Sequence, residues 1–443
     1  MTVDRARQAT VTTIAGTAIV IADMVGVGVF TSLGFQVKDV TSNFAILLLW
    51  FIGGLVALCG AFCYAELSAM FPRSSGEYNF LTRAYSPGTG FLAGWLSATV
   101  GFSAPVALAA MAFGDYFKAI VPGAPPLISG LAAIWLISAF HLVGIRQGSA
   151  FQIASTVLKL ALIVGFIVAG FVVGGGRDVS FMPKPGDSAL IFSAPFAMSL
   201  VFVMYAYSGW NAATYIVSEI KDPQRSLPKA LFMGTGTVIV LYLALNAVFL
   251  YTTPVADLSG QLNVAEIVGT HIFNRSGGRI VGGLICIGLI STISAMMWIG
   301  PRVTMTMGED LPMLRLFARR SANGVPATAI SFQLVVASLL LLTGSFEAVL
   351  DFIQFSLTFC SFLTVLGMVK LRFTRPDFPR PYRAWGYPVT PIIFLGATSL
   401  IMYYLITVRP LQSFAGFLMM CAGLLLYGLG TLQQSAARRA PAE

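Results

Sequence analysis

The sequence predicts an all-α integral membrane protein with twelve transmembrane helices. Of its 443 residues, 57% are hydrophobic and only 10% are charged, against about 25% in an ordinary soluble domain. The mean hydropathy is +0.82. Apolar runs fill most of the chain, and a water-soluble globule of this size needs far more polar surface. Soluble, disordered and collagen-like classes are therefore excluded.

Each expected span is an apolar stretch of the length that a helix needs to cross a bilayer, about 20 residues. The first stretch is longer than the apolar core of a signal peptide, so we expect no cleavable signal. The twelve stretches are 12–36, 43–70, 91–118, 126–143, 149–174, 191–218, 229–253, 278–306, 326–344, 348–370, 388–408 and 412–433.

The distribution of positive charge predicts the orientation. With a cytoplasmic N-terminus, 19 of the 27 Lys and Arg residues fall on the cytoplasmic side and 7 on the outer side. Cytoplasmic loops of membrane proteins carry such an excess. We therefore expect a multi-pass protein of the bacterial inner membrane with both termini cytoplasmic. Its net charge of +9 then serves topology and contacts with membrane lipids, and no nucleic acid partner is expected.

Residues that build enzyme and metal sites are scarce. The 5 cysteines lie inside apolar stretches without disulfide or metal-ligand spacing, and the 2 histidines are far apart. The acids inside the spans are isolated rather than paired. We therefore expect no enzyme, no metal and no cofactor. No phosphate-binding loop is present to use ATP, and no run resembles the selectivity filter of a channel.

Two spans contain an interruption at mid-depth. The first span carries Gly26 and Gly28, each of which weakens a helix by about 1 kcal/mol relative to alanine. The sixth span carries Ser208 and Gly209 among aromatic and amide side chains. Breaks at matching places in two oppositely oriented halves point to the midplane site of a transporter. Glycine also permits close helix packing, so each break alone has a purely structural alternative.

The chemistry of such breaks favours a zwitterion. A broken helix exposes backbone N–H groups at one end and C=O groups at the other. The N–H groups, with the positive end of the helix dipole, suit a carboxylate, and the C=O groups suit an ammonium. The paired breaks therefore predict binding of an amino acid.

Three segments resemble the amino acid–polyamine–organocation (APC) transporter superfamily. Residues 26–30 resemble its G-S-G-I-F break, and residues 64–78 resemble its Y-A-E-L…P-x-S-G-G-x-Y segment, with Ser75 in place of the first glycine. Residues 205–228 resemble Y-S-G-W-N…E-E-x-x-N-P-x-R-x-L-P of the L-amino-acid transporter-like branch. The three segments occur in the family's order in a chain with twelve expected spans.

The resemblance implies a LeuT-type fold, a 5+5 inverted repeat plus two C-terminal helices. The first repeat is expected within residues 1–175, the second within 190–370, and the added helices with a cytoplasmic tail within 371–443. It implies a sodium-independent secondary active transporter that moves amino acids by alternating access. We expect a monomer or weak homodimer. A non-transporting amino-acid sensor on the same scaffold is the alternative from another class.

The resemblance also implies the substrate contacts. The substrate carboxylate meets the N–H groups of Val27 and Gly28, and its ammonium meets carbonyls near Tyr205 and Ala206. Tyr205 or a neighbouring aromatic such as Trp210 gates the outer side. The whole expected set is Val25, Gly26, Val27, Gly28, Tyr205, Ala206, Tyr207, Ser208 and Asn211.

Lys159 lies at the centre of the fifth span, where a charge costs about 2.5–3.5 kcal/mol. We expect it to face the bundle interior rather than to snorkel from lipid. By resemblance it replaces the sodium ion of Na⁺-coupled relatives and bridges the backbone near Met24 and Val25 to hydroxyls such as Ser291 and Ser294. If it exchanges a proton, transport is proton symport. If it stays charged, it is a fixed strut and the protein is an exchanger.

Asp23 is the second unusual charge in the spans. It is expected to contact Lys159, to line the permeation route, or to be packed and hydrogen-bonded without a transport role. An acid near the site favours a cationic substrate, whereas the apolar surroundings, including Phe102 and Trp210, favour neutral ones.

Two further acids lie near cytoplasmic helix ends. Glu66 is followed by Arg73, and Glu219 is followed by Lys221. We expect each acid to form either part of an inner gate or a structural ion pair with the basic residue that follows it.

Overall fold

The protein is helical throughout the part of the chain that the structure describes. This computed structural model describes residues 11–143, 145–321 and 324–439. Arg5 and Arg7, which support the predicted orientation, lie outside the described residues. Apart from one isolated bridge between Val11 and Ile220, the described chain contains helices, turns and loops. The predicted all-α class is confirmed.

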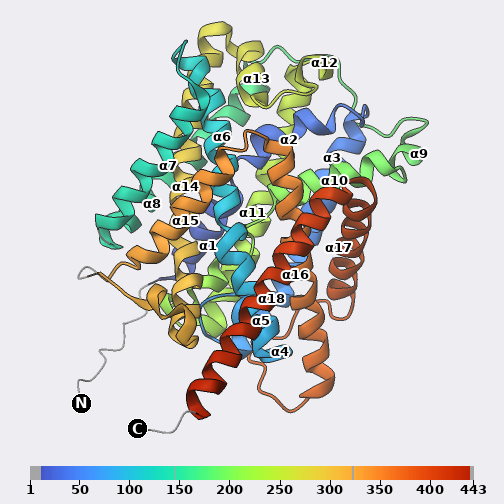
Figure 1. Ribbon diagram of the computed structural model, residues 1–443. Coiled ribbons are helices and arrows are strands. Elements are labelled where there is room, and N and C mark those ends of the chain that lie inside the picture. Colours follow the sequence, from blue (N-terminus) through green and yellow to red (C-terminus); the bar gives the residue numbers. More distant parts are fainter. Residues whose placement is uncertain (1–10, 144, 322–323, 440–443) are drawn as a thin grey trace.

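Most long helices run between an upper and a lower end of the molecule, with α12 and α13 at the upper end and α4 at the lower (Figure 1). The elements are α1 (Thr13–Met24), α2 (Gly28–Gln36), α3 (Asn43–Met70), α4 (Glu77–Ala84), α5 (Pro87–Leu96), η1 (Ser97–Gly101), α6 (Ser103–Ile120), α7 (Pro126–Val143), α8 (Ile145–Val172), α9 (Asp187–Ile191), α10 (Ala194–Ala206), η2 (Ala212–Glu219), α11 (Pro223–Thr252), α12 (Val255–Leu258), α13 (Val264–Phe273), α14 (Arg275–Asp310), η3 (Pro312–Ala318), α15 (Ala327–Leu341), α16 (Phe346–Thr374), α17 (Val389–Val408) and α18 (Pro410–Arg439).

Nine helical segments of the described chain are long and apolar enough to cross a membrane. They coincide with nine of the twelve expected spans. The sixth and ninth expected spans coincide with shorter apolar helices, Ala194–Ala206 and Ala327–Leu341, and the fifth coincides with α8, whose apolar part includes Thr156–Val172. The sixth is short because α10 ends at its predicted break. The chain is therefore an integral, multi-pass membrane protein.

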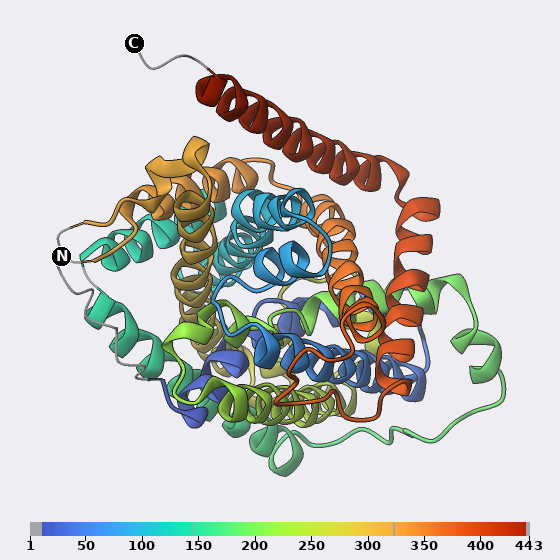
Figure 2. The same ribbon diagram turned by 90° about the horizontal axis from the view of Figure 1, so that it is seen from below.

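The helices differ in how much apolar surface they leave exposed. Val20 of α1 and Val201 of α10 are fully buried inside the bundle. In contrast, α17 and α18 lie at the edge (Figure 2), and Leu411 and Leu425 of α18 are 75% and 69% exposed. Exposed leucines of this kind are typical of the outer surface of a membrane-spanning bundle.

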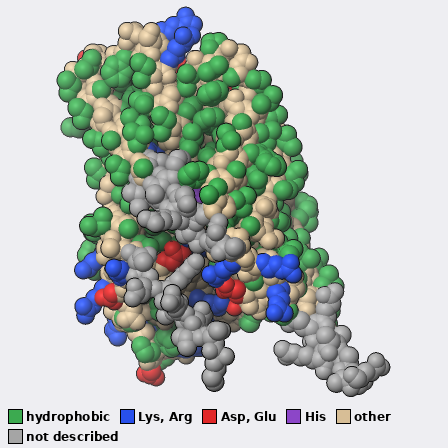
Figure 3. Space-filling model, turned by 90° about the vertical axis from the view of Figure 1, so that its left-hand side faces the viewer, with side chains coloured by type: hydrophobic (Ala, Val, Ile, Leu, Met, Phe, Trp, Pro, Cys, Tyr) green, Lys and Arg blue, Asp and Glu red, His purple; other side chains and the backbone are tan. Residues whose placement is uncertain are grey.

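Charged side chains gather toward the lower end of the molecule, below a broad apolar band (Figure 3). Several form ion pairs between elements that are distant in sequence. The expected pairing of Glu219 with Lys221 is wrong, because the Arg302 side chain of α14 reaches Glu219 instead. Three of these pairs are Arg73–Asp310 at 2.7 Å, Arg302–Glu219 at 2.9 Å and Arg320–Glu309 at 2.9 Å.

Glu66 of α3 anchors the end of α16 and the loop that follows it. Its fully buried carboxylate accepts hydrogen bonds from the Arg372 guanidinium and, at 2.6 Å, from the Ala384 N–H, and it lies 3.5 Å from Arg380 Nε. The expected ion pair between Glu66 and Arg73 is wrong, because the chain after α16 folds back against α3 and supplies other partners. Glu66 thus joins α3 to a segment that lies more than 300 residues later in the sequence.

We predict that Glu66→Ala destabilises the fold strongly. The substitution leaves two guanidinium groups without their buried carboxylate, which costs about 3–5 kcal/mol of unfolding free energy. Glu309→Ala removes an exposed pair with Arg320 and costs about 0–1 kcal/mol. Thermal unfolding of the purified variants in detergent measures the difference, and equal melting temperatures contradict the anchoring role.

Candidate functional site

The first transmembrane segment is interrupted between α1, which ends at Met24, and α2, which begins at Gly28. No acceptor for the N–H groups of Val27, Gly28 and Val29 is found within the described chain, and α2 has no side-chain cap. The positive end of the α2 dipole therefore carries free donors at the break. The predicted interruption of this span is confirmed.

The sixth expected span is interrupted in the same way. Helix α10 ends at Ala206, and the 3-10 helix η2 begins at Ala212. Between them Gly209 adopts a φ of +94°, which glycine takes without the steric cost of other residues. A Cβ at Gly209 would lie only 2.8 Å from Asp23 Oδ2, so glycine also allows the two breaks to approach.

The two breaks are packed against each other and share one hydroxyl group. A Cβ on Gly28 would lie 2.5 Å from Ala206 Cα, so the two backbones touch. The Tyr242 hydroxyl of α11 lies 2.6 Å from the Met24 carbonyl and 3.0 Å from the Ala206 carbonyl, in position to donate to either. Nothing in the apolar sequence of α11 singles out Tyr242, so sequence analysis missed it.

Lys159 of α8 satisfies further carbonyls of the first break. Its side chain is 2% exposed. The ammonium donates to the Ala22 carbonyl at 2.9 Å, to the Val25 carbonyl at 2.5 Å and to Thr292 Oγ1 at 3.2 Å. The expected bridge from the first break to the eighth span is present, but Thr292 supplies its hydroxyl.

Of the two serines expected to receive Lys159, Ser294 has a different partner. Ser294 Oγ lies 2.9 Å from Nε2 of His141, on α7, so this expected contact is wrong. Ser291 is fully buried next to Thr292. Successive residues of a helix point about 100° apart, so the rotation of α14 decides which hydroxyl faces Lys159.

A polar cavity of about 80 Å³ lies beside the second break. Of the expected substrate residues, Ser208 and Asn211 line it, whereas Val25 to Gly28 and Tyr205 to Tyr207 are buried at the breaks. The described residues that line the cavity are Asp23, Glu77, Ser97, Gly101, Phe102, Pro105, Ser208, Gly209, Trp210, Asn211, Tyr215, Met296, Leu357 and Ser361.

Glu77, the first residue of α4, brings a buried carboxylate to this cavity. It is 5% exposed and accepts hydrogen bonds from Tyr64 Oη at 2.9 Å, from Asn211 Nδ2 at 2.9 Å and from Tyr215 Oη. Burial raises the pKa of this carboxyl, and the donated hydrogen bonds oppose the increase. Sequence analysis missed its role, because an acid after Gly76 in a loop is typical of an exposed charge.

Asp23 brings a second buried carboxylate to the same cavity. Its side chain is 4% exposed, and its Oδ1 has no hydrogen-bond partner among the described residues. No ion pair within 4.0 Å joins it to Lys159, although the two charges attract each other at longer range. Which of the alternatives left open by the sequence describes the role of Asp23 stays a prediction.

Comparison with known proteins identifies the family. The amino acid permease family model matches residues 11–429. The chain belongs to the amino acid permease family. The permease is 26% identical to human b(0,+)-type amino acid transporter 1 over 94% of this chain and 85% of that protein. It is 23% identical to mouse Asc-type amino acid transporter 1 over 94% and 80% of the two chains.

A third relative agrees with this placement. Human large neutral amino acids transporter small subunit 2 is 25% identical over 94% of this chain and 79% of its own length. All three relatives are amino acid transporters by name, which confirms the predicted superfamily and the expectation that the chain is not an enzyme.

The expected gate residues of this permease lie in different surroundings. Tyr205 is 4% exposed at the end of α10. Trp210 lines the polar cavity and packs edge-on against Tyr64, with ring centroids 4.6 Å apart. Glu66 does not line the cavity and forms the anchor described above. Their action as gates stays a prediction.

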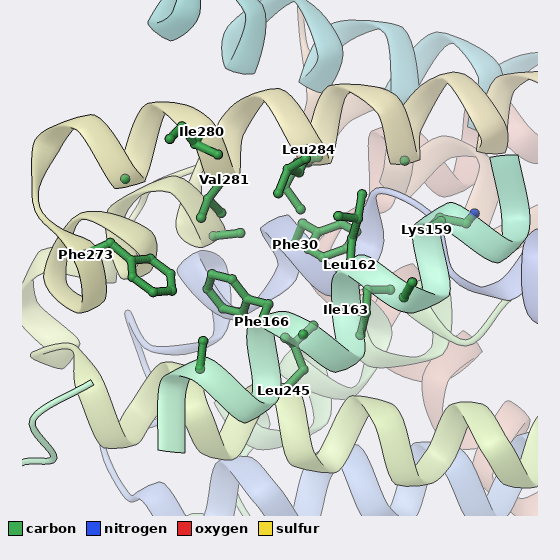
Figure 4. Close-up of a pocket in the computed structure, with 17 residues that line it drawn as sticks. Phe30, Lys159, Leu162, Ile163, Phe166, Leu245, Phe273, Ile280, Val281 and Leu284 are labelled. Atoms are coloured by element: carbon green, nitrogen blue, oxygen red, sulfur yellow. The ribbon is translucent and has the colours of Figure 1, made fainter. Parts of the chain in front are cut away.

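An apolar pocket of about 410 Å³ lies on the other side of Lys159, between α8, α13 and α14 (Figure 4). Phe166, Phe273 and Leu284 line it, and the Lys159 nitrogen points away from these side chains. Its walls are almost entirely hydrocarbon, so it offers no partner for a zwitterion. The polar cavity and the breaks are therefore the candidate site.

We predict that Tyr242→Phe weakens the packed pair of breaks. The substitution removes the donor shared by the carbonyls of Met24 and Ala206. The Met24 carbonyl keeps the Gly26 N–H, whereas the Ala206 carbonyl loses the Tyr242 hydroxyl, and a buried unsatisfied polar group costs about 1–3 kcal/mol. The matched control is Tyr403→Phe, because Tyr403 is 60% exposed. Thermal unfolding in detergent should show a lower melting temperature for Tyr242→Phe alone, and equal values contradict the role of this hydroxyl.

Proposed function

We propose that this permease is a secondary active transporter that moves amino acids by alternating access, independently of sodium and by proton symport. The observation that carries the proposal is the packed pair of helix breaks, with free N–H donors at Val27 to Val29. Interrupted half-helices at the midplane are typical of transporter substrate sites. The names of the relatives support amino acids as the substrate.

We propose twelve transmembrane helices in a LeuT-type 5+5 inverted repeat plus two. The repeats fall within residues 1–175 and 190–370, and the last two helices and tail fall within 371–443. Matching breaks after α1 and α10, five spans apart, support the inversion. We propose the bacterial inner membrane, lipid contacts around the edge, and a monomer or weak homodimer. The Lys and Arg side chains gathered at the lower end support a cytoplasmic location of that end (Figure 3).

The N-terminus of α2 is the proposed carboxylate site. The N–H groups of Val27 and Gly28 point along the positive end of the α2 dipole, where an anion is stabilised. The proposed ammonium contacts are carbonyls near Tyr205 and Ala206, with Ser208 and Asn211 beside them. Because Asn211 donates its amide N–H to Glu77, its carbonyl oxygen is the atom that suits an ammonium.

The position of Lys159 supports the proposed sodium independence. Two carbonyls and one hydroxyl surround its ammonium, and oxygen ligands of this kind also suit a hard metal cation. A resident ammonium fills that place with the same charge. If Lys159 releases its proton during the cycle, transport is symport. The alternative is an exchanger (antiporter) in which Lys159 stays charged, and a non-transporting sensor is the remaining class.

Uptake of radiolabelled amino acids into proteoliposomes tests this proposal. Proton symport requires uptake that increases with an inward proton gradient and needs no internal amino acid. Exchange requires internal amino acid and is independent of the gradient. Binding without uptake under any of these conditions indicates a sensor and contradicts transport.

We predict that Lys159→Ala changes the coupling of transport. The variant should lose the dependence of uptake on the proton gradient or, in an exchanger, make exchange symmetric between the two sides. The physical reason is that the carbonyls of Ala22 and Val25 lose their cation. Uptake rates with and without the gradient measure this effect, and wild-type behaviour contradicts the role of Lys159.

We predict that Gly28→Val abolishes substrate uptake. Its Cβ would lie 2.5 Å from the backbone of Ala206, so the breaks must separate and the α2 donors move. Gly236→Val is the control, because a Cβ there meets nothing within 4 Å. Both variants should remain monodisperse in detergent, and wild-type uptake by Gly28→Val argues against the site.

A further inference from the structure

We propose that the polar cavity selects amino acids with a net charge of +1, whose side-chain cation lies between Asp23 and Glu77. This inference rests on the proposed transport function and deepens it by naming the substrate class. It is carried by the position of two buried carboxylates in one cavity and by the unpartnered oxygen of Asp23.

Both acids are buried too deeply for water to screen them. Asp23 is 4% exposed and Glu77 is 5% exposed. A buried anion is costly unless hydrogen bonds or a cation compensate it. Glu77 has three donors, whereas Asp23 Oδ1 has none among the described residues. A nearby cation therefore stabilises the charged form of Asp23 more than that of Glu77.

The protein does not supply that cation within the cavity. None of the described residues that line it is Lys, Arg or His. The Lys159 ammonium is directed to the first break, and Arg302 of α14 pairs with Glu219. Two carboxylates and one nearby ammonium leave an excess of one negative charge, which a neutral zwitterion does not compensate.

The shape of the site assigns this charge to the side chain of the substrate. None of Val27, Gly28 and Val29 lines the polar cavity, although their N–H groups form the proposed carboxylate site. A substrate held there by its carboxylate, and by its ammonium at Ser208 and Asn211, extends its side chain into the rest of the cavity. Phe102 and Met296 give that side chain apolar walls for its methylene groups.

The cavity must widen to admit this group. Its volume of about 80 Å³ is below the roughly 300–1,000 Å³ of pockets that enclose small molecules. Alternating access separates the helices that line it, since they come from both proposed repeats.

Arginine and citrulline are the matched probes, because they have nearly the same shape and differ in side-chain charge. We expect wild-type proteoliposomes to take up arginine at least about tenfold more efficiently than citrulline, equivalent to about 1.4 kcal/mol. Equal uptake of the two overturns the inference and leaves the proposed function intact. Uptake of neither, nor of any other amino acid, overturns the proposed function.

Variants separate charge recognition from general damage. Asp23→Asn should lower the arginine-to-citrulline ratio about tenfold, Glu77→Gln should lower it less, and Asp23→Glu should restore part of it. Asp39→Asn, an exposed acid, should keep the wild-type ratio. An equal loss of both uptakes in folded Asp23→Asn, or a change in proton dependence alone, overturns the inference.

Ligand-induced thermal shifts of the purified protein in detergent test binding without transport. Stabilisation by arginine and not by citrulline, lost in Asp23→Asn, supports the inference even in a protein that transports nothing. Equal stabilisation by both amino acids overturns it.

Discussion

The structure depends on how backbone groups released inside a membrane find partners. Lipid offers no hydrogen bonds, so an interrupted helix is stable only where the protein replaces them. Here Lys159 and Tyr242 carry out that replacement, and each comes from a different helix. The two side chains convert a costly interruption into a fixed junction of α1, α8, α10 and α11.

The hydrogen-bond donors and acceptors of this junction differ in whether the protein supplies their partners. The carbonyls of Ala22, Met24 and Val25 have protein donors, whereas the N–H groups at the start of α2 have no acceptor in the described chain. The carbonyl acceptors of the junction are therefore satisfied, whereas its N–H donors are free to bind a ligand. A carboxylate can accept hydrogen bonds from these donors, and a cation cannot.

Local sequence features were enough to predict the breaks and the buried lysine. A glycine in the middle of a span weakens the helix, and a charge far from both ends of its span must be buried in protein. Both effects depend only on the neighbouring residues in the sequence. The partners were harder to predict. Thr292 rather than Ser294 meets Lys159 because of the rotation of one helix, and Arg372 rather than Arg73 meets Glu66 because of a contact between distant segments. Neither contact can be predicted from a short stretch of sequence.

The same distinction explains why the acids of the cavity were only partly anticipated. Asp23 stood out because it lies within an apolar span, but its alternatives remained open until its surroundings were known. Glu77 looked like a loop residue, and only the fold buries it beside Asp23. The carbonyls of the first break already have donors, whereas these carboxylates and the side-chain oxygen of Asn211 are acceptors that suit a cation. The first break thus suits the anionic end of a substrate, and the two acids give the site a preference at its other end.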